Sequence, residues 1–239
     1  ILDICLGSAA TVELSGNLAN GNYLITYDIS GANAQSGLTA SANLTAGNGT
    51  GSFPIPFSEL GNIGNTIFII REVGFITGES CDVTGLSVLS TFDVEANPNV
   101  TGLTATVPPA CLGDDAIVTL GGNLANGTYQ ISYDLGGTNA LPAQTATATL
   151  TASDGSGTFT IPAASLTNTG NTTLTITAVA NTTGQNCSAT GLSIGDNFSI
   201  EARPDISALG VSVDNLCAGT DATVSLSGNL ANGTYTIDY

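Results

Sequence analysis

The chain has 239 residues and a formal net charge of −17, with two arginines as its only basic side chains. So acidic a chain repels a phosphate backbone, which makes nucleic acid a poor partner. The absence of histidine and lysine removes the commonest general base, the commonest zinc ligand and every lysine nucleophile. No apolar run approaches the ~20 residues of a spanning helix, so no membrane span is expected in these residues.

The sequence repeats itself with a constant spacing. The heptapeptide SGNLANG or GGNLANG occurs at 15–21, 121–127 and 227–233. Cys5, Cys111 and Cys217 keep the same spacing. A period of about 100 residues is the size of an independently folding domain and is too long for a solenoid repeat. We therefore expect three units: unit 1 (1–97, its first strand truncated), unit 2 (98–203, complete) and unit 3 (204–239, partial).

Unit 2 is predicted to consist of about seven short strands. In chain order they are expected at 100–107, around Val118 and Leu120, at 128–135, 147–152, 157–162, 172–179 and 192–202. Each segment is rich in β-branched residues and is bounded by Gly, Asn, Asp or Pro, and 56–60 allows one helical turn at most. Seven strands in about 100 residues predict an all-β, immunoglobulin-like sandwich, with an up-and-down barrel as the alternative.

The segment 128–135 alternates polar and apolar residues, which is the period of a half-buried strand. Its apolar positions should face the core: Tyr129, Ile131, Tyr133 and Leu135. The heptapeptide before it is then predicted to connect two adjacent strands, with Gly16 and the Asn-Gly pairs at positive φ. The residues that define this turn are Gly16, Asn17, Asn20 and Gly21, then Gly122, Asn123, Asn126 and Gly127, and finally Gly228, Asn229, Asn232 and Gly233.

The five cysteines also follow the repeat. Cys81 and Cys187 stand at matching positions of units 1 and 2, each 76 residues after the first cysteine of its unit. This even count per unit predicts one disulfide in each, Cys5–Cys81 and Cys111–Cys187, formed in an oxidising compartment. Cys217 would pair outside this sequence. The alternative is buried free thiols in a cytosolic protein.

Short junctions containing Pro98 and Pro204 join the units and favour semi-rigid connections. Several carboxylates lie near the junctions and loops: Asp93, Glu95, Asp114, Asp115, Asp205, Asp214 and Asp221. Calcium at these residues is one hypothesis, since carboxylate oxygens are its usual ligands. However, there is no loop of regularly spaced Asp residues, and solvated turn carboxylates are the simpler interpretation. No cofactor is expected.

Ile67 and Ile69 of unit 1 stand where unit 2 has threonines. If Phe68 and Ile70 face the core, the two isoleucines face outward and could mark a partner surface or be covered locally. Arg71 is expected to form a surface charge pair with Glu72. No enzyme motif is present, and acids such as Glu13 are not kept between units, so no enzymatic activity is expected.

The pattern CLGxxAxVxLSGNLANGxYxIxYD, followed by SFPIP or TFTIP, GNTxxxI and a second cysteine, is distinctive. It resembles the tandem repeats of giant cell-surface proteins that Bacteroidota export by the type IX secretion system, above all the SprB-type gliding-motility adhesins of flavobacteria. The resemblance covers essentially the whole chain. It implies a long filament on the outside of a bacterial cell that grips the substratum.

Two functional hypotheses follow. The first is a stalk or spacer segment of an adhesin filament, whose partners are the neighbouring repeats of the same chain. The second is a module that binds a glycan or a protein on its faces or at its junctions. An aromatic cluster in one unit would favour binding, but the six tyrosines are mostly assigned to core strands.

Overall fold

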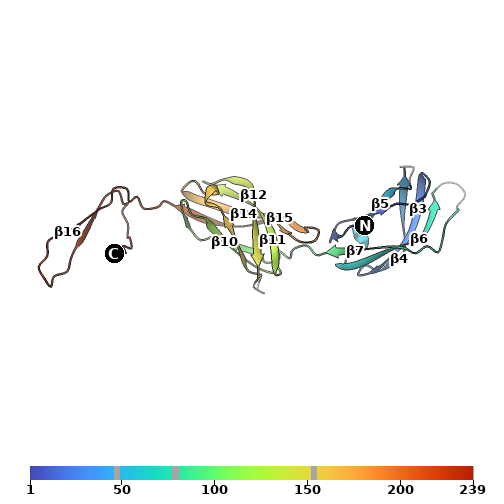
Figure 1. Cartoon of the computed structure of the whole chain (residues 1–239), viewed down its shortest axis with the longest axis horizontal. Coiled ribbons are helices and arrows are strands. Elements are labelled where there is room, and N and C mark those ends of the chain that lie inside the picture. The colour runs from blue at the N-terminus through green and yellow to red at the C-terminus, as the bar shows by residue number, and fades with distance from the viewer. Residues whose placement is uncertain (46–48, 77–80, 152–154, 239) are drawn as a thin grey trace.

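The structure is a computed structural model that describes residues 1–45, 49–76, 81–151 and 155–238. The units follow one another along the long axis of the molecule (Figure 1). Two separate hydrophobic clusters form the cores, one within residues 10–94 and one within 103–200. The boundaries at 97/98 and 203/204 remain predictions.

Unit 1 contains β1 (Ile4–Cys5), β2 (Ala10–Leu14), β3 (Gly21–Gly31), β4 (Gln35–Leu44), β5 (Gly51–Ile55), β6 (Gly64–Phe75) and β7 (Val88–Glu95). Unit 2 contains β8 (Thr104–Thr106), β9 (Ala110–Cys111), β10 (Ala116–Gly121), β11 (Gly127–Gly137), β12 (Leu141–Leu150), β13 (Gly157–Ile161), β14 (Gly170–Asn181) and β15 (Ser188–Glu201). Unit 3 contains β16 (Gly210–Val213) and β17 (Val224–Ser227). The helical segments of the described residues are single 3-10 turns, Phe57–Glu59 and Ala163–Ser165.

Unit 2 is an immunoglobulin-like β-sandwich. Its strands are hydrogen-bonded in the order β8-β10-β13-β12-β11-β14-β15-β9, in which a short pairing of β12 with β13 connects the two layers. The order excludes an up-and-down barrel, because β10 pairs with β13 and not with β11, the next strand in sequence. The first two strands of unit 2 belong to different layers: β8 runs antiparallel to β10, and β9 runs parallel to β15.

Unit 1 has the same arrangement, divided into a five-stranded sheet β1-β7-β6-β3-β4 and a pair β2-β5. In unit 3, β16 and β17 pair in the register of β8 and β10, since Gly210 lies opposite Ser227 as Thr104 lies opposite Gly121. The repeat in sequence is therefore a repeat in hydrogen bonding.

The core follows the predicted alternation. Tyr129, Ile131, Tyr133 and Leu135 on β11 are all buried, and so are their counterparts on β3. The hydroxyl of Tyr27 donates to Glu59 Oε2 at 2.8 Å. Burial, and secondly this carboxylate, raises the pKa of Tyr27, and burial alone raises the pKa values of Tyr129 and Tyr133. These phenols therefore stay neutral and act as core side chains with a polar end.

The heptapeptide connects strands in opposite layers, β2 to β3 and β10 to β11, and is not a hairpin turn. A tyrosine two positions after each copy fixes it: Tyr23, Tyr129 and Tyr235 donate to the carbonyls of Ala19, Ala125 and Ala231 at 2.9, 3.0 and 2.7 Å. Gly122 and Gly228 have the predicted positive φ, at +135° and +142°. Gly21 and Gly127, at +159°, are close to extended backbone, and Gly16 and the asparagines of these loops do not have positive φ. The repeated tyrosine thus fixes the loop in the same way in all three copies.

A buried asparagine fixes a second loop in the same way in both units. Asn139 Nδ2 donates to the Asn168 carbonyl at 2.9 Å and to Thr172 Oγ1 at 2.8 Å, while its Oδ1 accepts the Asn168 N–H at 2.9 Å. Asn33 makes the matching bonds to Asn62 and Thr66. Because every polar atom of the amide side chain is used, the burial carries no unpaired group.

The junction between units as candidate functional site

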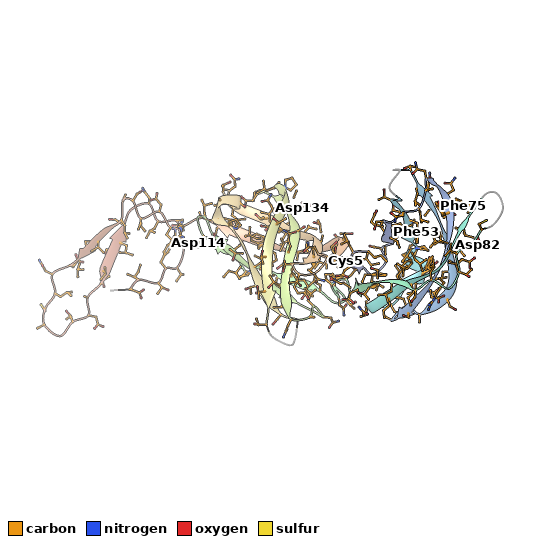
Figure 2. The ribbon with its side chains drawn as sticks, turned by 45° about the vertical axis from the view of Figure 1, so that its right-hand side comes forward. Cys5, Phe53, Phe75, Asp82, Asp114 and Asp134 are labelled. Carbon is orange, nitrogen blue, oxygen red and sulfur yellow. A yellow bond between two sulfur atoms is a disulfide. The ribbon has the colours of Figure 1, made fainter. Side chains whose placement is uncertain are left out.

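A disulfide joins Cys5 of unit 1 to Cys187 of unit 2, with their Cα atoms 5.3 Å apart. The predicted pairs Cys5–Cys81 and Cys111–Cys187 are therefore wrong, and Cys81, Cys111 and Cys217 are free and exposed. The bridge closes a sequence separation of 182 residues and crosses from one sandwich to the next. Figure 2 shows Cys5 between the two sandwiches.

The strand layout explains why the cysteines of one unit do not pair. Cys111 lies opposite Glu201, the last residue of β15, whereas Cys187 immediately precedes the first residue of the same strand. A strand of 14 residues spans roughly 40 Å, and disulfide geometry requires Cα atoms within about 7 Å. The two cysteines of unit 2 thus lie at opposite ends of the sandwich, and Cys187 is at the end that meets unit 1.

The end of unit 1 presents Cys5 to unit 2. In β1, Ile4 and Cys5 pair in parallel with Val94 and Glu95, and the Leu6 N–H donates to the Glu95 carbonyl at 2.8 Å. This short strand holds Cys5 beside the last residue of β7, where the chain leaves the sandwich. β1 was not predicted from sequence, because two residues are too few to show an alternating pattern.

The Glu95 side chain contacts unit 2 directly. Its Oε2 accepts the Gln185 N–H at 3.0 Å and lies 3.8 Å from Cys187 Sγ. Gly184 has φ +68°, and a Cβ there would lie 2.2 Å from Glu95 Oε2, so this approach requires glycine. Asn181 Nδ2 adds a bond of 3.3 Å to the Ala96 carbonyl. With these contacts around it, Cys187 is 1% exposed.

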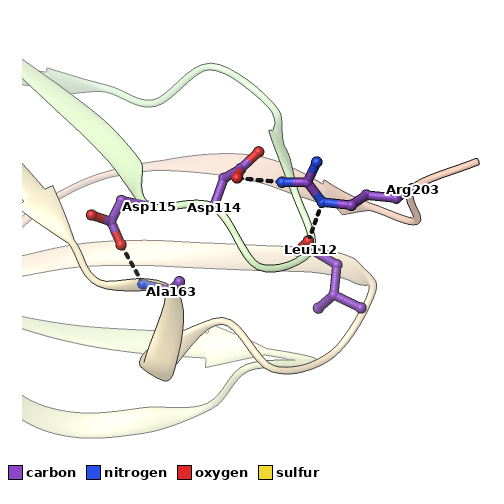
Figure 3. A network of polar contacts seen from close by, with 5 residues as sticks. All are labelled: Leu112, Asp114, Asp115, Ala163 and Arg203. Atoms are coloured by element: carbon purple, nitrogen blue, oxygen red, sulfur yellow. Dashed lines mark hydrogen bonds and ion pairs between the residues drawn. The ribbon is translucent and has the colours of Figure 1, made fainter.

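The far end of unit 2 repeats the geometry of the end of unit 1. The Leu112 N–H donates to the Glu201 carbonyl at 2.8 Å, as Leu6 does to Glu95. Arg203 Nε donates to the Leu112 carbonyl at 3.0 Å, which is the contact that Asn97 Nδ2 makes to Leu6 at 3.1 Å. Arg203 also forms an ion pair with Asp114 (Figure 3). Cys111 is therefore held as Cys5 is held.

Five of the seven carboxylates considered for calcium accept hydrogen bonds: Asp93, Glu95, Asp114, Asp115 and Asp205. Asp115 Oδ1 accepts the Ala163 N–H at 2.7 Å (Figure 3), and Asp93 Oδ1 accepts from Asn65 Nδ2 at 3.0 Å. Asp205 accepts from the N–H and the hydroxyl of Ser207. Among the described residues, no group of three or more Cys, Asp or Glu is arranged to hold a metal ion. Calcium stays an untested hypothesis.

A cleft in unit 1 has a volume of about 530 Å³ and is lined by residues of β2, β3, β6 and β7 and the segment before β7. Glu13, Leu14 and Ser15 line it, and these match the three residues of β10 that pair with β8 in unit 2. Ser90 also lines it and matches Asp196, which accepts the Val107 N–H at 2.8 Å. In unit 2 the same space holds β8, with Leu103, Ala105 and Val107 buried. The cleft is thus the place of a first strand and carries no argument for a small-molecule site.

The outer face of β6 in unit 1 is apolar. Phe68 and Ile70 are buried, as predicted, which leaves Ile67 and Ile69 half-buried on the opposite face. Ile69 lies opposite Leu89 of β7, which is 63% exposed. The matching residues of unit 2 are Thr173, Thr175 and Gly195. The patch Ile67, Ile69 and Leu89 therefore belongs to one unit alone.

Arg71 was predicted to form a charge pair with Glu72, but it pairs with another residue. Its Nε donates to Asp28 Oδ2 of the neighbouring strand at 2.7 Å. Successive residues of a strand point to opposite faces, so a cross-strand partner is the favoured one. The Gly37 N–H, and secondly Arg71, lowers the pKa of Asp28. Because this pair is exposed, it is a surface feature and not a buried charge site.

Comparison with known proteins gives no family. No protein-family model matches the chain, and no curated protein matches it. Among solved structures, trypsin-activated alpha-2-macroglobulin from Escherichia coli aligns with 83% of this chain at 13% identity and a TM-score of 0.29, and the chain spans 15% of that protein. A chimeric titin Z1Z2-Z1Z2 tandem, functionalised with a GRGDS peptide from fibronectin, aligns with 84% of this chain and 95% of its own length at 13% identity and a TM-score of 0.19. Scores this low carry no functional argument. Within the described residues, no helix has the length and apolar character needed to cross a membrane.

The junction contacts were largely missed from sequence, although a signal for them exists. Glu13 is replaced by Thr119 and Ser225, whereas Glu95 recurs as Glu201. An acid that is kept while others vary has a defined place in the repeat. Here that place is the last residue of β7 and β15, beside the first cysteine of the unit.

Proposed function

We propose that the chain is a spacer segment of a long extracellular filament on a bacterial cell surface, and that its work is mechanical. The observation that carries the proposal is the Cys5–Cys187 bridge, which joins two repeated sandwiches across their junction. A binding or catalytic domain needs a disulfide only within its own fold. A covalent bond from one repeat to the next instead maintains the connection between repeats under load.

The surroundings of the bridge support an extracellular role. Stable disulfides form and persist in oxidising compartments, which include the bacterial cell exterior. Among the described residues, the hydrogen bonds across the junction are Glu95–Gln185 and Asn181–Ala96. Each such bond contributes only about 1 kcal/mol, so the disulfide, which adds a second covalent link to the main chain, does most to keep the two ends in contact. The setting in a gliding-motility adhesin rests on the sequence resemblance described above.

The proposal is tested by changing the number of units in the intact surface protein. Removing residues 98–203, one full period, should shorten the filament seen by electron microscopy and leave adhesion per filament unchanged. The cells would then grip the substratum from a shorter distance. Loss of adhesion at normal surface amounts of the shortened protein would contradict a spacer role and would assign binding to the deleted unit.

A second candidate function is favoured by the apolar patch Ile67, Ile69 and Leu89. An exposed apolar patch that one repeat has and the next lacks is a feature of a partner-binding surface. Replacing Ile67 and Ile69 by threonine, the residues of unit 2, should abolish binding of a glycan or protein ligand if this candidate is correct. Unchanged adhesion and an unchanged folded state in the double variant would reject it. Thr173→Ile with Thr175→Ile in unit 2 is the reciprocal variant.

A further inference from the structure

Each complete unit offers one cysteine at either end, and the two ends are not equivalent. Cys5 and Cys111 lie opposite the last residue of the last strand, Glu95 and Glu201 respectively. Cys187 lies before the first residue of β15, at the end that meets the preceding unit. At the junction of units 1 and 2, an end carrying a first cysteine therefore meets an end carrying a second cysteine.

Cys111 has the setting of Cys5 in each contact described for β1 and β9. Both pair in parallel with a strand-end glutamate, and both precede a leucine whose carbonyl accepts from residue 97 or 203. The chain then continues from Arg203 into unit 3, whose β16 and β17 keep the register of unit 2. The two cysteines differ in their partners: Cys5 is bonded to Cys187, and Cys111 is free and exposed.

Cys81 and Cys187 show the same contrast at the opposite end of the unit. Cys187 is buried where unit 1 covers it with Glu95, whereas Cys81 of unit 1 is exposed. The burial of a second cysteine thus accompanies the approach of a preceding unit. Its position in the fold alone does not bury it.

We propose that disulfides lace the whole array, each joining the first cysteine of one unit to the second cysteine of the next. Cys111 is assigned to the second cysteine of a completed unit 3, and Cys81 to the first cysteine of a unit placed before unit 1. Every internal unit is then bonded to both neighbours. The inference deepens the proposed spacer function and rests on it for its setting.

Formation of each disulfide is an oxidation that needs an electron acceptor. Two thiols lose two protons and two electrons as the sulfur–sulfur bond forms, and a disulfide-carrying oxidoreductase accepts both and becomes a dithiol. The attacking species is a thiolate, so the thiol must be reachable before the bond is made. Cys111 is exposed and meets this requirement.

In such an array, the chain segments closed by successive disulfides overlap, and this has a mechanical consequence. The loop closed by Cys5–Cys187 contains Cys111, so the next bond begins inside the first loop. A pull along the filament passes from Cys5 through the bond to Cys187 and then along β15 toward unit 3. The remaining strands of units 1 and 2 lie outside this path. An array with one bond inside each unit would instead leave every junction without a covalent link besides the main chain.

The test completes unit 3 by appending a copy of residues 134–203 after Tyr239, which supplies a second copy of Cys187. The appended copy carries Ser193→Ala, so that its cysteine peptide differs in mass from the native one. The extended chain is produced in an oxidising compartment with a disulfide-exchange oxidoreductase. Free thiols are then alkylated, and unreduced peptides from cleavage after Asp and Glu are identified by mass spectrometry. We expect Cys111 bonded to the copied Cys187 and Cys5 bonded to the native Cys187.

Three further results make the test decisive. A bond between Cys111 and the native Cys187 would overturn the proposal. Alkylation of Cys111 while Cys5–Cys187 is intact would also overturn it, because the intact bond shows that the chain has folded and oxidised. Cys111→Ser should leave the copied Cys187 alkylated and Cys5–Cys187 unchanged, and a rearranged pairing in that variant would also overturn it. Adhesion is not measured, so failure of the lacing is distinguishable from failure of the spacer role.

Discussion

Buried amides show how single residues hold the loops of this sandwich. Asn139→Ala removes the partners of the Asn168 N–H, the Asn168 carbonyl and the Thr172 hydroxyl at once. Leaving such buried groups unpaired costs about 2–3 kcal/mol, so unit 2 should lose about this much free energy of unfolding. Urea denaturation followed by tyrosine fluorescence measures the loss. Asn126→Ala, at an exposed residue with a 3.4 Å bond, is the control and should change stability by less than about 0.5 kcal/mol. Equal effects of the two substitutions would contradict the role given to Asn139.

A surface carboxylate gives a residue-scale prediction about pH. The Gly37 N–H and Arg71 lower the pKa of Asp28, so its folded-state pKa lies below the unfolded value of about 3.9. The sign follows from linkage: the stabilisation is complete above the unfolded pKa and is lost as pH falls through the folded pKa. An NMR titration of the Asp28 carboxyl carbon should therefore show a midpoint below about 3.9. Arg71→Thr, the residue of unit 2, should raise that midpoint but keep it below the ordinary value, because the Gly37 bond remains. A midpoint unaffected by the substitution would show that Arg71 does not act on Asp28.

Elements differ in how far sequence alone could place them. The long strands were predictable because Tyr129 to Leu135 alternates over four buried positions, and the matching residues of β3 in unit 1 are buried in the same way. The two-residue strands β1 and β9 have no such pattern, yet they decide where Cys5 and Cys111 lie. The cysteine pairing was therefore mispredicted: an even count per unit says nothing about the two ends of a sandwich. Junction contacts such as Glu95 with Gln185 depend on the approach of two domains, which local sequence does not encode.

The first strand is the element whose contribution can be tested most directly. In unit 2, β8 buries Leu103, Ala105 and Val107 against β10 and β15, while in unit 1 the matching space is the 530 Å³ cleft. Placing a copy of residues 98–106 before Ile1 should fill the cleft and stabilise unit 1. Burial of a leucine and an alanine at the copied positions contributes about 2–4 kcal/mol before the entropy of ordering the segment is subtracted. Hydrogen exchange should show slower exchange of β2 amides in the extended chain, with β10 as the internal reference. The same extension with aspartate in place of the copied Leu103 and Ala105 is the matched control, and equal protection by both would contradict the assignment.

At the scale of the whole molecule, the disulfide decides how the chain responds to force. Pulling oxidised protein from its two ends cannot extend the chain between Cys5 and Cys187, because the bond bypasses a separation of 182 residues. Reduction should release this segment, and at about 3.4 Å per residue the gain in contour length is roughly 600 Å. Single-molecule force spectroscopy with and without a reductant measures the gain directly. Cys5→Ser should behave as reduced protein under both conditions, whereas Cys81→Ser should behave as the parent, because Cys81 has no part in the bond. Bonds within the units would instead show in Cys81→Ser, which would open the segment between Cys5 and Cys81 in oxidised protein and lengthen it by roughly 260 Å. A filament built from such junctions extends little under load until its disulfides break, and this is the property that a surface-borne spacer requires.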